Sequence, residues 1–429
     1  MAARDPLLLI YRIATLIATP FAPAALAWRL RKGKESRERL SERMGYPSRT
    51  RPKGYLAWMH GASVGEALAL LPLVDQLVAR GFHVLVTTGT VTSAAILAPR
   101  LPPGACHQFL PLDSPRFIAR FLNHWQPDLT LIAESEIWPN ILYELHERRI
   151  PLVLVNARVS QRSFKRWQKF PNLIASLLKR IDLCLAQTDE DASRLLRLGA
   201  PRVQVAGNLK YDVPAPPVDN TKLAQLTAAI GPRPVWIAAS THPGEEELIA
   251  QVHKRVAQVT DGLLTIIVPR HTQRGPEIAA IAQKYGIPSA MRSRGANIDN
   301  GTQFYIADTM GELGLFYRLS GVVFVGKSLG AHGGQNPIEP AKLGCAILHG
   351  PHVSNFSEVY QALDASRGSA QVGDADTLAR ALVMLLSDAS LLRKMARASS
   401  EAVDGLSGAT NNIIMALEPY FMQMRVENR

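Results

Sequence analysis

The chain has 429 residues, of which 47% are hydrophobic and 20% charged, so it is long enough for two or three globular domains and too apolar for a disordered protein. Its formal net charge of +12 indicates an acidic partner such as an anionic lipid, a nucleic acid or a phosphorylated substrate. The sequence contains no basic run interleaved with aromatic residues and no C2H2 spacing, which argues against nucleic acid. Its three widely spaced cysteines argue against a disulfide framework or a zinc site.

The first 30 residues have the composition of a membrane anchor. Leu7–Trp28 is apolar apart from Arg12 and a few threonines, and a length of roughly 20 residues is enough to cross a bilayer. A basic cluster beginning at Arg29 follows directly, which predicts that the rest of the chain lies in the cytoplasm. Pro20 and Pro23 leave a second interpretation open, a helix that lies in the membrane interface.

From Tyr55 onward, short apolar strands alternate with amphipathic helices, and a proline-rich segment at 213–220 separates two such series. The strands expected in the first series are Tyr55–Met59, His83–Thr88, Cys106–Leu110, Leu129–Ala133, Leu152–Val155, Leu183–Ala186 and Val203–Ala206. Those expected in the second are Val235–Ala238, Leu263–Val268, Phe304–Ala307, Val322–Val325 and Ala346–Leu348. Expected helices include Glu66–Ala79, Arg116–Trp125, Asp376–Leu386, Ser390–Val403 and Ala409–Met424. This pattern predicts an α/β protein with two doubly wound parallel sheets in tandem and a ligand-binding cleft between them.

Three polar motifs follow strands in the first series. "MHGASVGE" turns through two glycines, which permit close approach of another molecule, and places Glu66 in the first turn of a helix, where the helix dipole also favours an acid. "AESEIWPN" places Glu134 and Glu136 two residues apart, on one face of an extended segment. "GNLKYD" places Lys210 beyond a strand, where a solvated surface lysine remains the alternative to a site residue.

In the second series, helix capping explains part of the polar pattern. In "ASTHPGEE", Ser240 or Thr241 can cap the following helix, with Glu245 and Glu246 in its early turns. Capping does not explain "VPRHTQRGPE", whose basic cluster around Arg270 lies on a strand-to-helix loop and could grip an anion.

Two further motifs of the second series open helices. "DTMGELG" leaves N–H groups free for phosphate. "GKSLGAHGGQNPIEPAKLG" leads from a glycine-rich loop into a helix, with Asn336 as the N-cap and Pro337 at the first helical position. Glu339 then faces the loop, where it could accept hydrogen bonds from ribose hydroxyls.

Ten motifs in this order match one family: "HGASVGE", "PLD", "ESEIWPN", "NARVSQRS", "GNLKYD", "STHPGEE", "PRHTQR", "DTMGEL", "GGQNPIEP" and "GPHVSNF". From the N-terminal anchor to "GPHVSNF", the chain resembles the 3-deoxy-D-manno-octulosonic acid (Kdo) transferases of lipopolysaccharide assembly. The resemblance implies a GT-B fold, with two Rossmann-like domains facing a cleft. It also implies an inverting glycosyltransferase that moves Kdo from CMP-Kdo to the lipid A precursor lipid IVA, without a metal or other cofactor.

The resemblance implies roles for single residues. Glu66 matches the family's catalytic base, and Glu134 and Lys210 match residues that stabilise the transition state. The segments that hold CMP match Pro269, Arg270, Met310, Gly311, Glu312, Asn336, Pro337, Ile338 and Glu339. The chain departs from the family pattern at Thr272 and Gln273 (usually Pro and Glu), at Gln335 (commonly His) and at Lys327 (commonly Gly), which leaves the details of CMP binding open.

The expected organisation is a membrane anchor over 1–30, a Rossmann-like acceptor-binding domain over 31–212 and a linker over 213–220. A Rossmann-like CMP-Kdo-binding domain over 221–408 follows, and a C-terminal helix over 409–429 is expected to pack back on the N-terminal domain. The expected partners are CMP-Kdo, an anionic lipid A precursor and the cell inner membrane, with the catalytic domains on the cytoplasmic side and no nucleic acid. Two alternatives are a nucleotide-sugar epimerase, which has no need of an anchor, and a membrane-tethered binder without catalysis, against which Glu66 and Arg270 argue.

Overall fold

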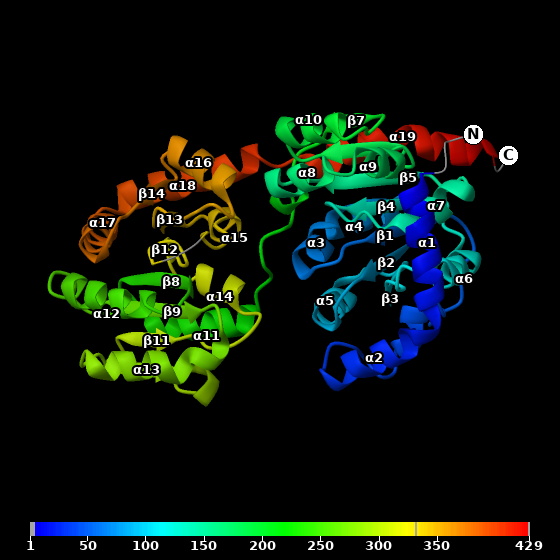
Figure 1. Ribbon diagram of the computed structural model, residues 1–429. Coiled ribbons are helices and arrows are strands. Elements are labelled where there is room, and N and C mark those ends of the chain that lie inside the picture. The colour runs from blue at the N-terminus through cyan, green and yellow to red at the C-terminus, as the bar shows by residue number, and fades with distance from the viewer. Residues whose placement is uncertain (1–4, 331–332, 428–429) are drawn as a thin grey trace. The chain divides into compact units, whose positions relative to one another are not determined.

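The computed structural model describes residues 5–330 and 333–427, and the chain divides into two compact units. The first unit contains the chain up to Val213 and again from Ser407, and the second contains Pro214–Leu406. Each unit has a seven-stranded sheet in which all neighbouring strands pair in parallel (Figure 1). The two expected Rossmann-like doubly wound sheets are therefore confirmed.

The sheet of the first unit has the strand order β3-β2-β1-β4-β5-β6-β7. Its strands are β1 (Leu56–His60), β2 (His83–Thr88), β3 (Ala105–Phe109), β4 (Leu129–Ala133), β5 (Leu152–Ala157), β6 (Leu183–Ala186) and β7 (Val203–Val205). Its helices are α1 (Pro6–Ala18), α2 (Ala22–Arg31), α3 (Val64–Ala69), α4 (Leu71–Ala79), α5 (Val91–Leu97), α6 (Pro115–Trp125), α7 (Pro139–Glu147), α8 (Gln161–Trp167), α9 (Pro171–Leu178), α10 (Asp189–Arg197) and α19 (Ala409–Glu427). Short 3-10 turns are η1 (Thr19–Phe21), η2 (Leu40–Met44), η3 (Ala98–Arg100) and η4 (Leu209–Tyr211).

The sheet of the second unit has the strand order β10-β11-β9-β8-β12-β13-β14. Its strands are β8 (Val235–Thr241), β9 (Leu264–Pro269), β10 (Ser289–Met291), β11 (Phe304–Ile306), β12 (Val322–Val325), β13 (Ala346–His349) and β14 (Ser369–Gln371). Its helices are α11 (Asn220–Ile230), α12 (Glu245–Val256), α13 (Gly275–Lys284), α14 (Leu313–Tyr317), α15 (Ile338–Lys342), α16 (Ser357–Ala365), α17 (Ala375–Ser387) and α18 (Ala389–Gly405), with 3-10 turns η5 (Thr272–Arg274) and η6 (Arg292–Arg294).

Alternate residues of β1 enter two different cores, as the two-residue period of a strand requires. Ala57 and Met59 pack with α4 and the C-terminal helix α19, whereas Leu56 and Trp58 pack with α6 and α7. Helices therefore cover both faces of the sheet, which explains why its strands are continuous apolar runs rather than alternating ones. The last helix of the chain belongs to the core of the first unit, although the whole second unit separates it from that unit in sequence.

Two expectations about the elements were wrong in detail. The helix expected over Glu66–Ala79 is two helices, α3 and α4, because Pro72 lacks an N–H and its ring clashes with the preceding turn, so it begins a new helix. The sequence pattern also missed β10 and β14. Both are three-residue strands at the edges of the second sheet, too short and too polar to form an apolar run.

The apolar N-terminal segment is not one continuous helix. α1 ends at Ala18, the 3-10 turn η1 contains Pro20, and α2 starts at Ala22 with Pro23 in its first turn. Figure 1 shows α1 running along the outside of the first unit and α2 turning away from its axis. The stretch Pro6–Arg31 still has the length and hydropathy of a membrane-spanning segment, with 17% of its most apolar window buried.

Candidate functional site

Glu66 lies in a reciprocal cap at the start of α3. Its backbone N–H donates to the hydroxyl of Ser63, and the Ser63 hydroxyl donates to Glu66 Oε1 at 2.7 Å. Glu66 Oε2 accepts from the N–H of Ala62 at 2.8 Å. Ser63 therefore caps α3, and the Glu66 carboxylate reaches back to the N–H of the residue before this cap, which gives the glutamate a structural task. Its side chain is partly exposed, and a carboxylate has about four acceptor positions, so these two bonds leave lone pairs available to a further donor.

Glu134 and Lys210 form an ion pair in the first unit. Glu134 follows β4, Lys210 belongs to η4, and the Lys210 ammonium donates to Glu134 Oε1 at 2.7 Å. Glu134 has a backbone φ of 56°, in the left-handed region that non-glycine residues rarely occupy. Asn156, which lies in β5, fixes the turn η4 that carries Lys210, because its Oδ1 accepts the N–H of Leu209 at 3.0 Å. A strained residue held in place by distant contacts is typical of functional sites.

The carboxyl edge of the sheet places Glu66 near this ion pair. β1 and β4 are paired parallel neighbours, and Glu66 and Glu134 follow their respective carboxyl ends. Helix α3, which carries Glu66, also contacts η4, which carries Lys210. Three of the expected site residues therefore converge on one sheet edge from three separate stretches of sequence.

A buried histidine lies at the same edge. His60 ends β1, is 1% exposed, and its Nδ1 lies 3.0 Å from the hydroxyl of Thr87. Within the described part of the chain its Nε2 has no hydrogen-bond partner, and Glu136 Oε2 is 3.8 Å away. Glu136 also accepts from the indole of Trp138 at 2.7 Å. The first of the two glutamates in "ESEIWPN" thus pairs with a lysine, and the second lies between an indole and a histidine.

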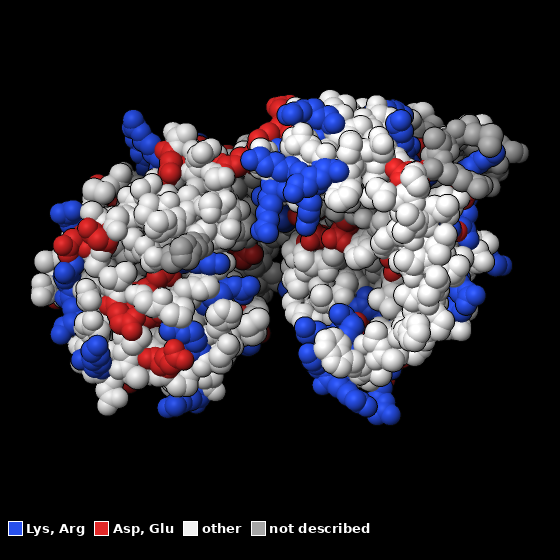
Figure 2. All heavy atoms as spheres, viewed as in Figure 1, with Lys and Arg blue, Asp and Glu red and all other residues white. Residues whose placement is uncertain are grey.

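Basic side chains gather over α8, which begins just after β5. Figure 2 shows this surface as a group of Lys and Arg atoms. The exposed basic residues of the segment are Arg158, Arg162, Lys165, Arg166 and Lys169. These residues follow the carboxyl end of β5, and Glu134 follows the carboxyl end of the paired strand β4. The first unit therefore carries positive charge at the sheet edge where Glu134 lies.

The motifs of the second unit lie at the carboxyl edge of its sheet. Pro269 is the last residue of β9, and the exposed Arg270 donates its N–H to the backbone oxygen of Thr241 at 3.1 Å. Met310 is 73% exposed on the loop after β11, next to Gly311, whose φ is 80°. α14, which follows Glu312, contacts α15, so the loops after β11 and β12 lie together.

The helix at "NPIEP" begins one residue later than expected. α15 starts at Ile338 rather than Pro337, because the Asn336 side chain accepts from the Ile338 N–H at 3.0 Å and closes the turn around the proline. Ile338 itself is buried, whereas Glu339 is partly exposed and accepts a long 3.4 Å contact from Asn336. Ala331 and His332 of the preceding glycine-rich loop lie outside the described residues.

The chain is similar to known proteins over nearly its full length. The family model for 3-deoxy-D-manno-octulosonic-acid transferase (kdotransferase) matches residues 38–213. The chain is 36% identical to the 3-deoxy-D-manno-octulosonic acid transferase of Haemophilus influenzae, over 91% of this chain and 93% of that one. It belongs to the Kdo transferase family. The Rickettsia bellii member is 31% identical over 88% of this chain and 90% of that one.

Solved structures place this family member among GT-B proteins. The UDP-GlcNAc 2-epimerase of Neisseria meningitidis superimposes with a TM-score of 0.58, covering 85% of this chain and 100% of that one at 15% identity. This likeness concerns the fold alone. Membership of the Kdo transferase family makes the chain a glycosyltransferase and disfavours the epimerase alternative.

Two departures from the Kdo transferase pattern lie in the segment between β12 and α15. Gln335 stands where a histidine is common, and its amide nitrogen lies 2.9 Å from His242 Nε2. Lys327 stands where glycine is common, and it adopts a φ of 58°, the left-handed conformation that a glycine would take without strain. Gln335 therefore has a partner on the loop after β8, and Lys327 keeps a backbone conformation that favours glycine.

Glu245 performs a task that the capping interpretation missed. The expected caps, Ser240 and Thr241, are wrong, because α12 begins after Gly244 and no side chain caps it. Glu245 is 2% exposed, and its carboxylate accepts the N–H groups of His242, Lys327, Ser328 and Leu329 at 2.7–3.3 Å. A buried carboxylate therefore satisfies the donors of the glycine-rich loop from within the protein.

Replacing Glu245 with Ala is expected to lower the free energy of unfolding by about 2–4 kcal/mol, since several buried N–H groups would lose their acceptor. Urea denaturation followed by circular dichroism measures the change. Glu247→Ala is the matched control on the same helix turn, expected to cost less than about 0.5 kcal/mol because its buried Oε2 has no hydrogen-bond partner among the described residues. Equal effects of the two substitutions would contradict the role given to Glu245.

Glu312 is enclosed by cations. Its carboxylate accepts from Arg292 at 2.5 and 2.8 Å, from Lys222 at 3.0 Å and from the hydroxyl of Thr309 at 2.5 Å. The hydrogen bonds from Arg292, followed by those from Thr309 and Lys222, outweigh burial and lower the pKa of Glu312 from 4.5 to about 2. The glutamate fixes the loop that precedes α14.

Because the folded-state pKa of Glu312 is depressed, its contribution to stability is complete above pH 4.5 and is lost as the pH falls toward 2. We expect the stability difference between wild type and Glu312→Gln to be constant from pH 7 to about 5 and to shrink below pH 4.5. Urea unfolding midpoints across this range measure it. A difference that does not change with pH would show that the carboxylate is not held in its charged form.

Proposed function

We propose that this chain transfers Kdo from CMP-Kdo to lipid IVA, a tetra-acylated, bis-phosphorylated lipid A precursor, in lipopolysaccharide core biosynthesis. The observation that carries the proposal is the convergence of Glu66, Glu134 and Lys210 on one edge of the first sheet, within the segment that the family model matches. The relative from Haemophilus influenzae is named as a 3-deoxy-D-manno-octulosonic acid transferase, which supports the transferred sugar.

In the proposed reaction, a hydroxyl of the lipid attacks the anomeric carbon of Kdo in a single displacement, and CMP leaves. Glu66 takes the proton of the attacking hydroxyl, a step typically worth roughly 10²–10⁴-fold in rate. Lys210, held by Glu134, stabilises the charge that develops in the transition state. A single displacement of this kind inverts the configuration at the anomeric carbon.

The second unit is proposed to bind the donor. Arg270 is exposed beyond β9 and offers its guanidinium to the CMP phosphate, while the start of α14 offers backbone N–H groups. Met310 and Gly311 follow β11, Asn336 and Glu339 follow β12, and the four complete the proposed donor-binding set at the same edge of the sheet. On this proposal, residues 31–212 bind the acceptor, 213–220 link the domains, 221–408 bind CMP-Kdo, and 409–429 support the acceptor-binding domain.

The proposed location is the cytoplasmic face of the inner membrane, with the first 30 residues as a single anchor. The anchor is apolar and is followed by basic residues, which favours a cytoplasmic body. An amphiphilic acceptor of this class resides in the membrane, so an attached enzyme meets it at high local concentration.

One experiment can test both the identity of the sugar donor and whether the transfer reaction needs a metal ion. Purified protein is incubated with lipid IVA and either CMP-Kdo or UDP-GlcNAc, with and without EDTA, and nucleotide release is measured. We expect CMP release only with CMP-Kdo, unchanged by EDTA, and a product whose NMR spectrum shows the inverted anomeric configuration. Turnover of UDP-GlcNAc in place of CMP-Kdo would overturn the proposal in favour of an epimerase.

A further inference from the structure

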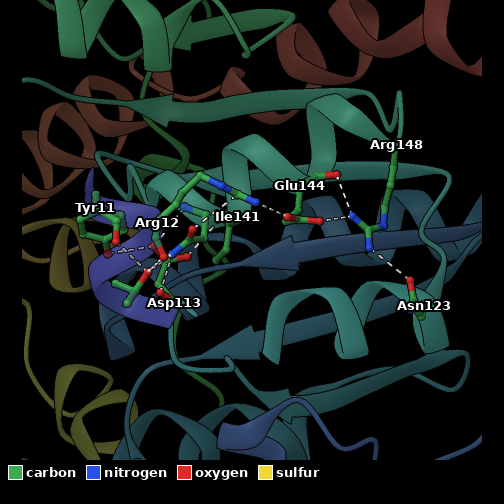
Figure 3. Close-up of polar contacts among 9 residues, drawn as sticks. Tyr11, Arg12, Asp113, Asn123, Ile141, Glu144 and Arg148 are labelled. Atoms are coloured by element: carbon green, nitrogen blue, oxygen red, sulfur yellow. Dashed lines mark hydrogen bonds and ion pairs between the residues drawn. The ribbon is translucent and has the colours of Figure 1, made fainter. Parts of the chain in front are cut away.

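Polar side chains of α1 point at the first unit, not into solvent. Tyr11 donates its hydroxyl to Asp113 Oδ2 at 3.0 Å (Figure 3). The Asn140 amide donates to the hydroxyl of Thr15 at 3.0 Å. Arg12 donates to Glu144 at 2.8 Å, and its guanidinium lies 3.6 Å from the ring centroid of Tyr143. The one charged residue in the middle of the apolar segment therefore has a partner on α7.

These contacts are largely buried and are tied to the structure of the unit. The Arg12 and Glu144 side chains are 19% and 12% exposed, and Glu144 also pairs with Arg148. Asp113 additionally accepts the N–H groups of Asn140 and Ile141, each at 3.1 Å, and so caps the start of α7. Helix α1 is thus docked on a helix that begins five residues after Glu134.

The other face of α1 is apolar and uncovered in the described chain. Its exposed large apolar residues recur at helical spacing and continue into η1 and α2: Leu7, Leu9, Ile10, Ile13, Leu16, Ile17, Phe21 and Trp28, between 38% and 71% exposed. Figure 2 shows the corresponding surface over α1 as a band without charged atoms. A continuous exposed apolar stripe of this kind marks an interaction surface.

Positive charge lies at one end of the stripe. Arg31, Lys32, Lys34 and Arg37 are exposed at and just after the end of α2, and the Lys32 ammonium lies 3.9 Å from the ring centroid of Trp28. An apolar face with an aromatic residue and flanking lysines and arginines is the composition of a helix that lies in the interface of an anionic bilayer.

The break between α1 and α2 and the docking of α1 argue against a crossing geometry for this arrangement. α1 has 13 residues and α2 has 10, so they extend about 20 and 15 Å, each shorter than the roughly 30 Å hydrocarbon core. A helix packed along α6 and α7 cannot also be surrounded by lipid on all sides. The apolar segment passes the length test for a span only if the bend and the docking contacts are ignored.

We propose that α1, η1 and α2 form an in-plane docking surface for an anionic lipid bilayer, with the apolar stripe inserted in one leaflet and the N-terminus on the same side as the catalytic units. The contacts of Tyr11, Arg12 and Asp113 fix the orientation of the first unit on that surface. This inference sharpens the proposed membrane location and does not depend on Kdo transfer.

The first test is vesicle flotation of the full chain with phosphatidylcholine vesicles containing or lacking phosphatidylglycerol. We expect binding to the anionic vesicles, and at least about tenfold weaker binding for the triple variant Ile10→Gln, Ile13→Gln, Ile17→Gln with an unchanged melting temperature. The matched control replaces three exposed apolar residues elsewhere, Leu196→Gln, Val259→Gln and Met384→Gln, and is expected to bind as wild type. Binding that is unaffected by the α1 substitutions would overturn the proposal.

The second test is the side on which the N-terminus lies. A protease-cleavable tag is fused to the N-terminus, and vesicles with the catalytic units facing outward are treated with external protease. Removal of the tag is expected, whereas a protected tag would show that the segment crosses the bilayer.

Sedimentation without lipid tests whether the apolar stripe binds a second copy of the chain instead of a bilayer. If the wild type forms a dimer that the triple variant cannot form, the stripe is a dimer interface and the proposal is overturned. Because none of these three experiments uses CMP-Kdo, their failure is distinguishable from failure of the proposed activity.

Discussion

Glu66→Gln is expected to lower the rate of Kdo transfer by roughly 10²–10⁴-fold, because an amide of the same shape cannot accept the proton of the attacking hydroxyl. The amide oxygen can still accept the N–H of Ala62, so the start of α3 should persist. Steady-state assays with lipid IVA and CMP-Kdo measure the rate, and thermal denaturation measures the fold. We expect the loss in kcat and an unchanged melting temperature within about 2 °C.

Ser63→Ala is the matched control, because it removes the capping hydroxyl and leaves the carboxylate. Loss of an N-cap typically costs about 1 kcal/mol of stability. If Glu66 acts only by holding the start of α3, the two variants will lose similar activity. If Glu66 is the base, Ser63→Ala will retain most of its activity but have a lower melting temperature. Glu66→Gln will then lose activity at an unchanged melting temperature.

Lys210→Met is expected to lower kcat by roughly 10²–10³-fold, the usual effect of removing one preorganised charged donor from a transition state. The KM for the acceptor should change little, since the cation acts on charge that develops only during reaction. Lys210→Arg keeps the charge and is expected to recover part of the rate. A large rise in KM with an unchanged kcat would instead assign the lysine to ground-state binding.

Glu134→Gln tests the same pair from the other side. The pair is joined at 2.7 Å, so the two residues are expected to act as a unit. The double variant Glu134→Gln, Lys210→Met should therefore lose about as much activity as Lys210→Met alone, rather than the product of the two single losses. Additive losses would show that the glutamate has a task of its own, separate from holding the lysine.

Most strands were predictable because they are buried on both faces, so that apolar runs such as Leu129–Ala133 and Leu183–Ala186 record burial directly. The short edge strands β10 and β14 were not, since an edge strand of three residues needs few apolar side chains. The break between α3 and α4 was present in the sequence as Pro72, and the helical period across it concealed the break.

The sequence singled out the residues of the candidate site but not their arrangement. Glu134 and Lys210 each follow a strand, but their pairing depends on the left-handed backbone of Glu134 and on the hold of Asn156 on Leu209, which no local pattern encodes. The docking of α1 was hidden for the same reason, because Tyr11 and Asp113 are 102 residues apart. In both cases the sequence shows that a polar residue is present but does not show which distant residue it contacts.

We propose that this member of the Kdo transferase family adds Kdo to lipid IVA, and the mass of the lipid product decides whether it does. Purified wild-type protein is incubated with CMP-Kdo and lipid IVA, and the lipid is analysed by mass spectrometry, with Glu66→Gln run in parallel. We predict that the lipid gains mass in whole Kdo residues with wild type, and that almost none does so with Glu66→Gln in the same time. A lipid of unchanged mass with wild-type protein would contradict the account.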